Sequence, residues 1–495
     1  MAIAGLYIGT TGAKITVFDE AGAELFAGYR DYPATRVTGA HEINAEGIRD
    51  AVLKLLAEAA HAVAELSAVG VASFGESFVL LDDNDSVLLP AILYTDPRGG
   101  EELRELTDAL GDAWLRGVTG LSPHPMFSLP KLMWIRKNRP EIYKQIKYVM
   151  QMEDYVCYLL TGERVVDYSL ATRIMAFDLD GLCWNQRILD AAGVDAAWLS
   201  KPVPSGAVAG TLRPELRRSL GLSRDVAVVA CCQDQVAAAI GSGVLQGGLA
   251  ADGAGTVECV TPVFRRDELL GDLTADGYVR IPYLRGGLFV TYAFTFTGGA
   301  LVRWFIDTLG GEQRAEAARR GVSVYELLEG GMRDEPTGML ALPHFAGAAT
   351  PHMDTDAKGV IVGLTLATGA SDVYRALMEG VCYEMALNVE RLRAAGIRVG
   401  ALHATGGGAK SRLWLQMKAD VLGLPVRRMR ADEAGTVGVI MLTGVATGAY
   451  PSLEAAAEVF IGVKETFLPR PEAHERYAAC YRRYRALYDA VRPLM

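Results

Sequence analysis

Hydrophobic and polar residues alternate through Leu6–Val17, LYIGTTGAKITV, on both sides of a Gly-Thr-Thr turn. Alternation around a short turn predicts a β-hairpin, which Glu24–Tyr32 extends into an antiparallel meander. A similar pattern returns at Ala251–Thr261, ADGAGTVECVT, where Gly-Thr again separates two strand-like runs. A turn of this kind is most often only a hairpin, yet its free backbone N–H groups and hydroxyls also suit phosphate oxygens. Two of them, one near the start of each half of the chain, predict two phosphate-binding turns.

The rest of the pattern predicts a mixed α/β chain. Helical periodicity marks residues 48–66, 101–110, 131–138, 152–161, 236–240, 301–309, 372–395 and 412–422. Val226–Cys232 is a continuous apolar run, which is typical of a central strand buried on both faces. The second half repeats the plan of the first, and the stretch GSGVLQGG between them, residues 241–248, is small and flexible. We therefore expect two duplicated α/β domains, residues 1–243 and 244–495, with a ligand cleft between them.

Composition and charge narrow the function. The 495 residues include 49 Lys and Arg against 59 Asp and Glu, a formal net charge of −10 without a basic cluster, which disfavours nucleic acid as a partner. The seven cysteines show no CxxC spacing and indicate buried thiols of a reducing compartment. The sequence shows neither a signal peptide nor an apolar run of membrane-spanning length. These features predict a cytoplasmic enzyme with no membrane partner.

Asp234 is the first candidate for chemistry. It follows the apolar run that ends at Cys232 and opens the helical pattern QVAAAI. A carboxylate at this end of a buried strand points toward the crevice where open α/β sheets bind ligands. There it could take a proton from a hydroxyl that attacks phosphorus. The local pattern suits a helix N-cap equally well, because Asp is frequent at that position.

A second candidate is the segment Thr405–Ser411, TGGGAKS, between a predicted strand at 402–404 and the helix that starts near Arg412. Its glycines allow a ligand to approach the backbone closely, and the helix N-terminus adds partial positive charge. The spacing of a Walker motif is absent. A tight turn capped by Ser411 is the alternative interpretation.

Together these segments resemble the FGGY family of carbohydrate kinases, from Leu6 to about Tyr450. MFSLPKLMWIRKN at Met126–Asn138 fits the first signature of the family, and GVIVGLTLATGASDVYRALMEG at Gly359–Gly380 fits the second closely. The segment that begins TGGGAKSRLW is similar to the nucleotide segment of the family. QDQVAAAIG matches the motif of the family that contains the catalytic Asp, so the resemblance identifies Asp234 as the expected general base.

The resemblance implies an actin/hexokinase-type fold, with two duplicated ribonuclease H-like domains around a catalytic cleft, and the use of ATP and Mg²⁺. It assigns sugar binding to the N-terminal domain and nucleotide binding mainly to the C-terminal domain. The implied sugar-binding residues are Glu76, Tyr94, Asp234 and Gln235. The implied ATP-binding residues are Thr10, Thr11, Lys14, Gly255, Thr256, Gly298, Gly299, Gly407, Gly408 and Ala409.

One position departs from the family pattern. Members usually carry an Asp that helps to hold Mg²⁺ where this chain has Tyr7, and a phenol is a poor ligand for that ion. Three accounts are open: ATP, water and Asp234 hold the ion; Asp252 or Glu258 substitutes from the second turn; or the protein is a degenerate kinase. We expect a working kinase, because the base and the other phosphate-contacting residues are in place. No metal ligand is certain, and Asp234 is the candidate, acting through water.

The segments expected to contact the substrate are most similar to those of xylulose and gluconate kinases. Glycerol kinases carry Arg-Glu where this chain has Gly75-Glu76, and Tyr94 stands where Trp is common. The leading expectation is phosphorylation of D-xylulose to D-xylulose 5-phosphate, a step of xylose metabolism. The alternatives are a kinase for another sugar, polyol or sugar acid, such as gluconate, glycerol or ribulose, and a non-catalytic sugar- or nucleotide-binding regulator. A homodimer is the default assembly for such an enzyme.

Overall fold

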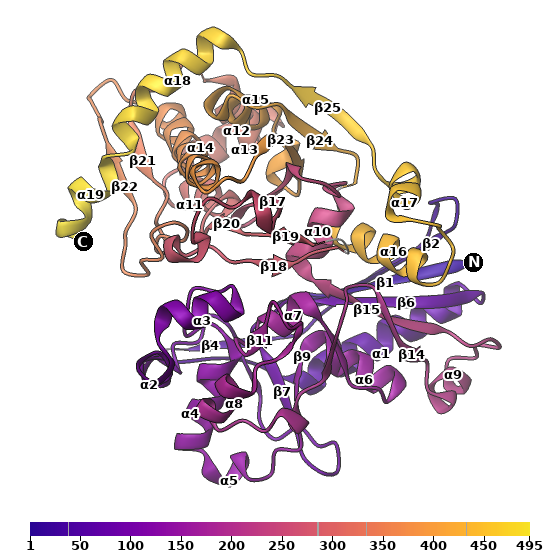
Figure 1. The fold of residues 1–495 in the computed structure, drawn as a ribbon. Coiled ribbons are helices and arrows are strands. Elements are labelled where there is room, and N and C mark those ends of the chain that lie inside the picture. The colour runs from indigo at the N-terminus through magenta and orange to yellow at the C-terminus, as the bar shows by residue number, and fades with distance from the viewer. Residues whose placement is uncertain (38, 285–286, 333, 432) are drawn as a thin grey trace. The chain divides into compact units, whose positions relative to one another are not determined.

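The computed structural model describes residues 1–37, 39–284, 287–332, 334–431 and 433–495, which Figure 1 traces as a ribbon. The chain forms two compact units. The first unit comprises Met1–Leu245, Val279–Val290 and Glu433–Ile461, and the second comprises Gln246–Tyr278, Thr291–Asp432 and Gly462–Met495. The first unit therefore includes two segments from the second half of the chain, whereas the second unit begins at Gln246.

The first unit contains a central sheet and several smaller ones. Its strands are β1 (Ala2–Ile8), β2 (Gly12–Asp19), β3 (Glu24–Asp31), β4 (Ala34–Val37), β5 (Ala40–Ile43), β6 (Leu66–Ser73), β7 (Phe78–Leu81), β8 (Ala91–Ile92), β9 (Tyr148–Gln151), β10 (Val165–Asp167), β11 (Phe177–Asp178), β12 (Cys183–Trp184), β13 (Lys201–Val203), β14 (Ala207–Thr211), β15 (Ala227–Gln233), β18 (Ile281–Pro282) and β19 (Leu288–Val290). Its helices are α1 (Ala45–Ala62), α2 (Gly100–Leu110), α3 (Asp112–Thr119), α4 (Ser128–Asn138), α5 (Pro140–Tyr143), α6 (Met152–Thr161), α7 (Tyr168–Thr172), α8 (Gln186–Ala192), α9 (Pro214–Ser219), α10 (Asp234–Gly241), α16 (Ala434–Ala446) and α17 (Leu453–Phe460).

The central sheet of this unit has the strand order β14-β15-β6-β1-β2-β3. Strands β1, β6 and β15 run parallel, while β1, β2 and β3 form the expected antiparallel meander. The register places Ile8, Ser73 and Gln233 level with one another at the carboxyl ends of the three parallel strands. The first Gly-Thr-Thr turn, the segment after Ser73 and Asp234 therefore all emerge at one edge of the sheet, where open α/β sheets bind ligands.

Helices α1 and α16 bury this sheet. Helix α1 begins after Asn44, whose side chain accepts a hydrogen bond from the Glu46 N–H at 2.8 Å, and its apolar stripe faces the core. Helix α16 lies beside β1 and α10, as the orange and indigo ribbons of Figure 1 show. Glycines allow the two helices to touch, because a Cβ on Gly241 would lie 1.8 Å from the Ala434 carbonyl oxygen. A segment from the last quarter of the sequence thus completes the core of the first unit.

The second unit has a sheet in which β17-β16-β23-β24-β25 follow in order. Its strands are β16 (Gly248–Ala254), β17 (Glu258–Arg265), β20 (Ala293–Thr295), β21 (Leu340–Leu342), β22 (Val360–Val362), β23 (Val399–Thr405), β24 (Val426–Met429) and β25 (Val463–Phe467). Its helices are α11 (Gly299–Thr308), α12 (Gly311–Arg320), α13 (Val324–Gly330), α14 (Ala370–Ala394), α15 (Arg412–Leu422), α18 (Pro471–Tyr484) and α19 (Leu487–Val491). Parallel pairing sets Gly253 opposite Thr405, so the second Gly-Thr turn and the TGGGAKS segment leave the sheet side by side.

The seven cysteines are free thiols, and five of them are buried, including Cys231 and Cys232 in β15. The expectation of buried thiols does not hold for Cys183, which is exposed, or for Cys480, which is half-buried. Within the described part of the chain, none of the helices has the length and apolar character needed to cross a bilayer.

Candidate active site

Asp234 is the first residue of α10 and follows β15 directly, as the sequence indicates. The N-cap position is Gln233, so Asp234 does not cap this helix. One of its oxygens, Oδ1, accepts a hydrogen bond from the Gln235 N–H at 2.7 Å. Burial, and next the neighbouring carboxylate of Glu76, raise the pKa of Asp234 to about 7, although Gln235 and Arg173 act in the opposite direction. Its carboxylate therefore has the basicity of a group that can accept a proton near neutral pH.

Glu76 lies in the segment after β6 and is buried against Arg173. The Arg173 Nη1 atom donates a hydrogen bond to Glu76 Oε1 over 3.1 Å. Glu76 has a φ of 64°, a conformation that costs free energy for a residue with a Cβ and is common at functional sites. Ser128 holds this backbone in place, because its hydroxyl donates to the Glu76 carbonyl oxygen at 2.9 Å.

Arg173 is a site residue that sequence reasoning missed. It follows α7, and that helix is attached beside Asp234, since the Gln233 N–H donates to the Ser169 hydroxyl at 2.8 Å. A Cβ on Gly75 would lie 2.7 Å from Cγ of Arg173, so the absence of a side chain at position 75 makes room for the arginine. The glycine next to Glu76 was visible in the sequence, but nothing in the sequence indicated which residue would fill the space.

Tyr94, in the loop after β8, belongs to the same group. Burial, followed by the charges of Glu76 and Asp234, raises the pKa of its phenol, which places the hydroxyl in the field of both carboxylates. The loop is held by Asp96, which is buried and accepts hydrogen bonds from the His41 N–H at 2.7 Å and from Arg98. The loop that contains Tyr94 is therefore fixed to the rest of the unit by hydrogen bonds and is not a free surface loop.

The first Gly-Thr-Thr turn is tight and begins at Gly9, whose N–H donates to the Gly12 carbonyl oxygen at 2.9 Å. Lys14, on the second strand of the hairpin, pairs with Tyr7 in register and forms an ion pair with Glu433, Nζ to Oε1 2.8 Å. Burial, then the charges of Asp234 and Glu433, raise the pKa of Tyr7 well above its usual value. The phenol therefore stays neutral and supplies no anionic oxygen for a metal ion.

The carboxylates of the second turn are also engaged. Asp252 and Glu258 are both buried against Lys418, whose Nζ lies 2.8 Å from Asp252 Oδ2 and in contact with Glu258 Oε1. Among the described residues, no group of three or more His, Cys, Asp or Glu side chains is placed to hold a metal ion. The side chains of these turns therefore do not fit a magnesium site held by the protein alone.

The second turn is joined to the N-terminus of α11. The N–H groups of Gly298 and Gly299 donate to the carbonyl oxygens of Thr256 and Gly255, both at 2.9 Å. A Cβ on Gly299 would lie 2.7 Å from the Gly255 oxygen, so only glycine allows this approach. On the other side, a Cβ on Gly406 would lie 2.7 Å from the Ala254 oxygen. Glycines therefore bring three segments together around one turn.

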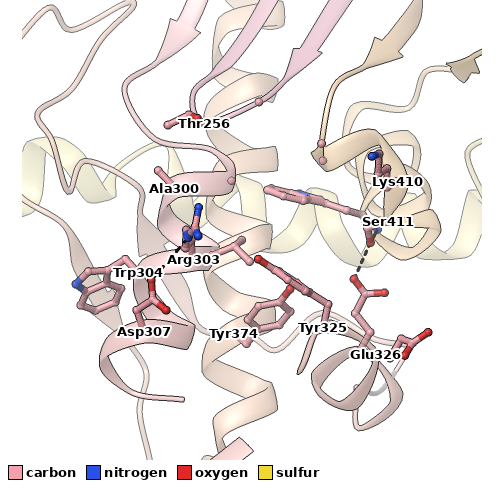
Figure 2. Close-up of a pocket in the computed structure, with 17 residues that line it drawn as sticks. Thr256, Ala300, Arg303, Trp304, Asp307, Tyr325, Glu326, Tyr374, Lys410 and Ser411 are labelled. Atoms are coloured by element: carbon pink, nitrogen blue, oxygen red, sulfur yellow. Dashed lines mark hydrogen bonds and ion pairs between the residues drawn. The ribbon is translucent and has the colours of Figure 1, made fainter. Parts of the chain in front are cut away.

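These three segments form one wall of a pocket of 780 Å³ in the second unit. Figure 2 shows Thr256 at the top of the view, Ala300 and Trp304 of α11 on the left, Lys410 and Ser411 on the right, and the rings of Tyr325 and Tyr374 between them. The Ser411 hydroxyl donates to Glu329 Oε1 at 2.8 Å, which joins the start of α15 to α13. The aromatic lining consists of Trp304, Tyr325, Tyr374 and Trp414. Such a pocket, with glycine backbone at one end and flat rings at the other, suits a ligand with an anionic part and a planar part.

Several residues expected to bind ATP line this pocket, namely Gly255, Thr256, Gly299, Gly407 and Gly408. Gly298 precedes α11 and is bonded to Thr256, while Ala409 is buried beside the pocket glycines. Thr10 and Thr11 lie on the first turn and Lys14 lies on β2, in the other unit. The aromatic lining was missed because Tyr325 lies on α13, which was not predicted, and because the other three rings lie on predicted helices whose pattern does not indicate a pocket.

Comparison with known proteins agrees with this architecture. Residues 2–241 match the N-terminal domain of the FGGY family of carbohydrate kinases, and residues 274–447 match the C-terminal domain of that family. A xylulose kinase of Staphylococcus epidermidis is 27% identical over 99% of this chain and 97% of its own length. A gluconokinase of Bacillus subtilis is 28% identical over 96% of this chain and 93% of its own length.

Solved structures agree in fold. A ligand-bound xylulose kinase from Lactobacillus acidophilus superposes with a TM-score of 0.91 at 22% identity, covering 99% of this chain and 98% of the other. A gluconate kinase from the same organism gives a TM-score of 0.90 at 22% identity over the same shares of the two chains. This likeness shows the two-domain, actin/hexokinase-like fold that the sequence predicts. With family models matching across both units, this chain belongs to the FGGY family of carbohydrate kinases and is a sugar kinase.

Proposed function

We propose that this kinase transfers the γ-phosphoryl group of ATP to a hydroxyl of a neutral ketose, with D-xylulose as the leading substrate and D-xylulose 5-phosphate as the product. The position of Asp234 carries the proposal. Its carboxylate lies at the carboxyl edge of the parallel strands, beside the Glu76–Arg173 pair, and has a pKa of about 7. A base of this strength, placed against a substrate hydroxyl, contributes typically ~10²–10⁴-fold to the rate.

The charges around Asp234 favour a neutral sugar over a sugar acid. Glu76 and Asp234 are both carboxylates, and the guanidinium of Arg173 already donates to Glu76. The carboxylate of an aldonate would add a third negative charge to this group, which like-charge repulsion disfavours. The curated relatives include both xylulose kinases and gluconokinases, and this balance of charge supports the former.

The pocket of the second unit supports ATP as the phosphoryl donor. Its aromatic rings offer a stacking surface for a purine, and the backbone of Gly255, Thr256, Gly407 and Gly408 lines the pocket, where phosphate oxygens can approach it closely. Mg²⁺ usually binds through phosphates and water with only one or two protein carboxylates, and when bound it neutralises charge on the transferred phosphoryl group. The protein side chains supply position: Asp234 orients the sugar hydroxyl and accepts its proton, and Lys14, fixed by Glu433, adds a cation beside the first turn.

ADP release across a panel of neutral and acidic substrates tests this proposal. With Mg²⁺ and ATP present, we expect D-xylulose to stimulate turnover more than D-ribulose or glycerol, and D-gluconate least. Asp234→Asn should reduce kcat by at least about a hundredfold while sugar binding, measured by calorimetry, is retained. Asp108→Asn, a matched change on the exposed surface of α2, should leave both unchanged.

The other outcomes identify the alternatives. Turnover that is fastest with D-gluconate would overturn the neutral-sugar assignment and leave the role of Asp234 intact. Binding of sugar and ATP without ADP release would instead identify a non-catalytic regulator. Full activity of Asp234→Asn would remove Asp234 as the base.

A further inference from the structure

Three charged side chains lie buried together beneath the second Gly-Thr turn. Asp252 is in β16 just before the turn, Glu258 opens β17 just after it, and Lys418 comes from α15. The relative exposure of each is 1% or less. The Lys418 Nζ atom lies 2.8 Å from Asp252 Oδ2 and also contacts Glu258 Oε1, so one ammonium joins both strands of the hairpin.

The three groups shift one another's ionisation. Burial, and next the charge of Asp252, raise the pKa of Glu258. Burial alone would lower the pKa of Lys418, but the two carboxyl groups more than reverse this effect and keep the amine protonated. A buried group of this kind gives little stability compared with well-packed apolar side chains, but its directional contacts fix geometry.

The cluster joins two parts of the pocket lining. The turn that follows Asp252 supplies Gly255 and Thr256, the N-cap of α15 supplies Ser411, and the first turn of that helix supplies Trp414. The Lys418 ammonium also lies 5.5 Å from the centre of the Trp414 ring. One long side chain therefore connects the strands that carry the phosphate turn to the helix that carries Trp414.

We propose that Lys418 is a positioning residue, which sets the distance between the Gly255–Thr256 turn and the start of α15. The inference rests on the proposed nucleotide pocket, and it concerns residues that do not touch the nucleotide. Without the ammonium, the hairpin loses its attachment to α15, and the backbone of the Gly255–Thr256 turn and that of Gly407 no longer meet one set of phosphates at the same time. Misplacement of this kind weakens ATP binding and transfer but leaves sugar binding unchanged.

Two variants and a control test the proposal. Lys418→Met removes the ammonium and keeps most of the side-chain volume. The triple variant Lys418→Met, Asp252→Asn, Glu258→Gln removes all three ionisable groups together, so that no unpaired charge is left in the interior. Lys464→Met, at an exposed site in β25, is the control. The readouts are calorimetric ADP affinity, KM for ATP, KM for the sugar, and hydrogen exchange of residues 253–257.

We expect the triple variant to fold, with KM for ATP and the dissociation constant for ADP raised by about tenfold or more. The KM for the sugar should stay within about twofold of the parent, and exchange of the turn should accelerate. A folded triple variant that binds ADP as the parent does would overturn the proposal. A triple variant that fails to fold would also overturn it, because the charges would then serve folding alone. If the parent itself binds no ADP or ATP, the proposed nucleotide pocket is wrong, which is a separate result.

Discussion

The side chain of Tyr7 is closely packed within the first unit. Its ring packs against Gly435, because a Cβ at position 435 would lie 2.5 Å from the ring carbon Cε2. The raised pKa of its phenol, caused by burial and then by Asp234 and Glu433, shows that two carboxyl groups lie near it. A third carboxylate in place of the phenol would add repulsion at this point. The neutral phenol thus adds no negative charge beside Asp234.

Replacement of Tyr7 by Asp should therefore impair a working enzyme. The added carboxylate would raise the pKa of Asp234 further, since like charges disfavour ionisation, and so reduce the fraction of active base at pH 7. We expect the acid limb of kcat/KM to move to higher pH by at least about half a unit. Tyr7→Phe, which keeps the ring, should leave the limb in place. An inactive parent that gains Mg²⁺-dependent turnover from Tyr7→Asp would contradict this expectation.

The raised pKa of Asp234 leads to a second prediction, on how activity and stability depend on pH. A general base acts in its deprotonated form, so kcat/KM should fall as the pH drops below about 7 and reach a plateau above it. The folded pKa lies above the usual value of 3.8, so ionisation of this group destabilises the folded state, fully above pH about 7 and less as the pH falls toward 3.8.

Asp234→Asn should consequently raise the melting temperature at pH 8 while it abolishes turnover, and the gain should shrink at pH 5. Thermal scans at the two pH values measure the difference. A variant less stable than the parent at pH 8 would show that the carboxylate is stabilised by its neighbours, contrary to its raised pKa.

Among the secondary-structure elements, α11 depends on close backbone contact. Its first residue, Gly299, donates to Gly255 at 2.9 Å with no room for a side chain. Gly299→Ala should push the helix away from the turn and raise KM for ATP by about tenfold or more, with little change in the KM for the sugar. Gly311→Ala, at the start of α12, is a matched control because a Cβ there meets open space. Equal nucleotide kinetics in both variants would show that the contact does not position the turn.

On the scale of the whole molecule, the first unit depends on residues late in the chain. Helix α16 packs on β1 and α10, and α17 follows it within Glu433–Ile461. A chain that ends after Ile461 retains both helices, whereas one that ends after residue 431 loses them. Both truncations lose β25 and α18 of the second unit, so they form a matched pair.

In the chain that ends after Ile461, we expect the amides of β1, β6 and β15 to be protected from hydrogen exchange. In the chain that ends after residue 431, we expect that protection to be lost. The reason is the exposure of the apolar surface that α16 covers, at roughly 25 cal/mol per Å². Equal protection in the two chains would show that the sheet is stable without α16.

Much of the architecture follows from local sequence. Alternation at Leu6–Val17 and the apolar run before Asp234 are patterns that only a few geometries satisfy, and both elements are present in the structure. The helix at Arg412 begins after Ser411, whose side chain accepts from the Trp414 N–H as a cap, as one interpretation predicted. Helix α16 was not predicted, because it is buried on nearly all sides and its apolar residues show no 3.6-residue period.

The sequence by itself determined the family, the two Gly-Thr turns and the position of Asp234 at the end of a buried strand, because these depend on contiguous residues. Only the tertiary structure decided which distant residues surround them. Arg173 fills the space beside Gly75, and Lys418 joins the two strands of the second turn. Neither Arg173 nor Lys418 lies on the same secondary-structure element as these residues, so the periodicity of the sequence does not indicate the contacts. The sequence offered Asp252 and Glu258 of the second turn as candidate metal ligands. In the structure both carboxyl groups instead contact Lys418, a lysine more than a hundred residues away in the chain.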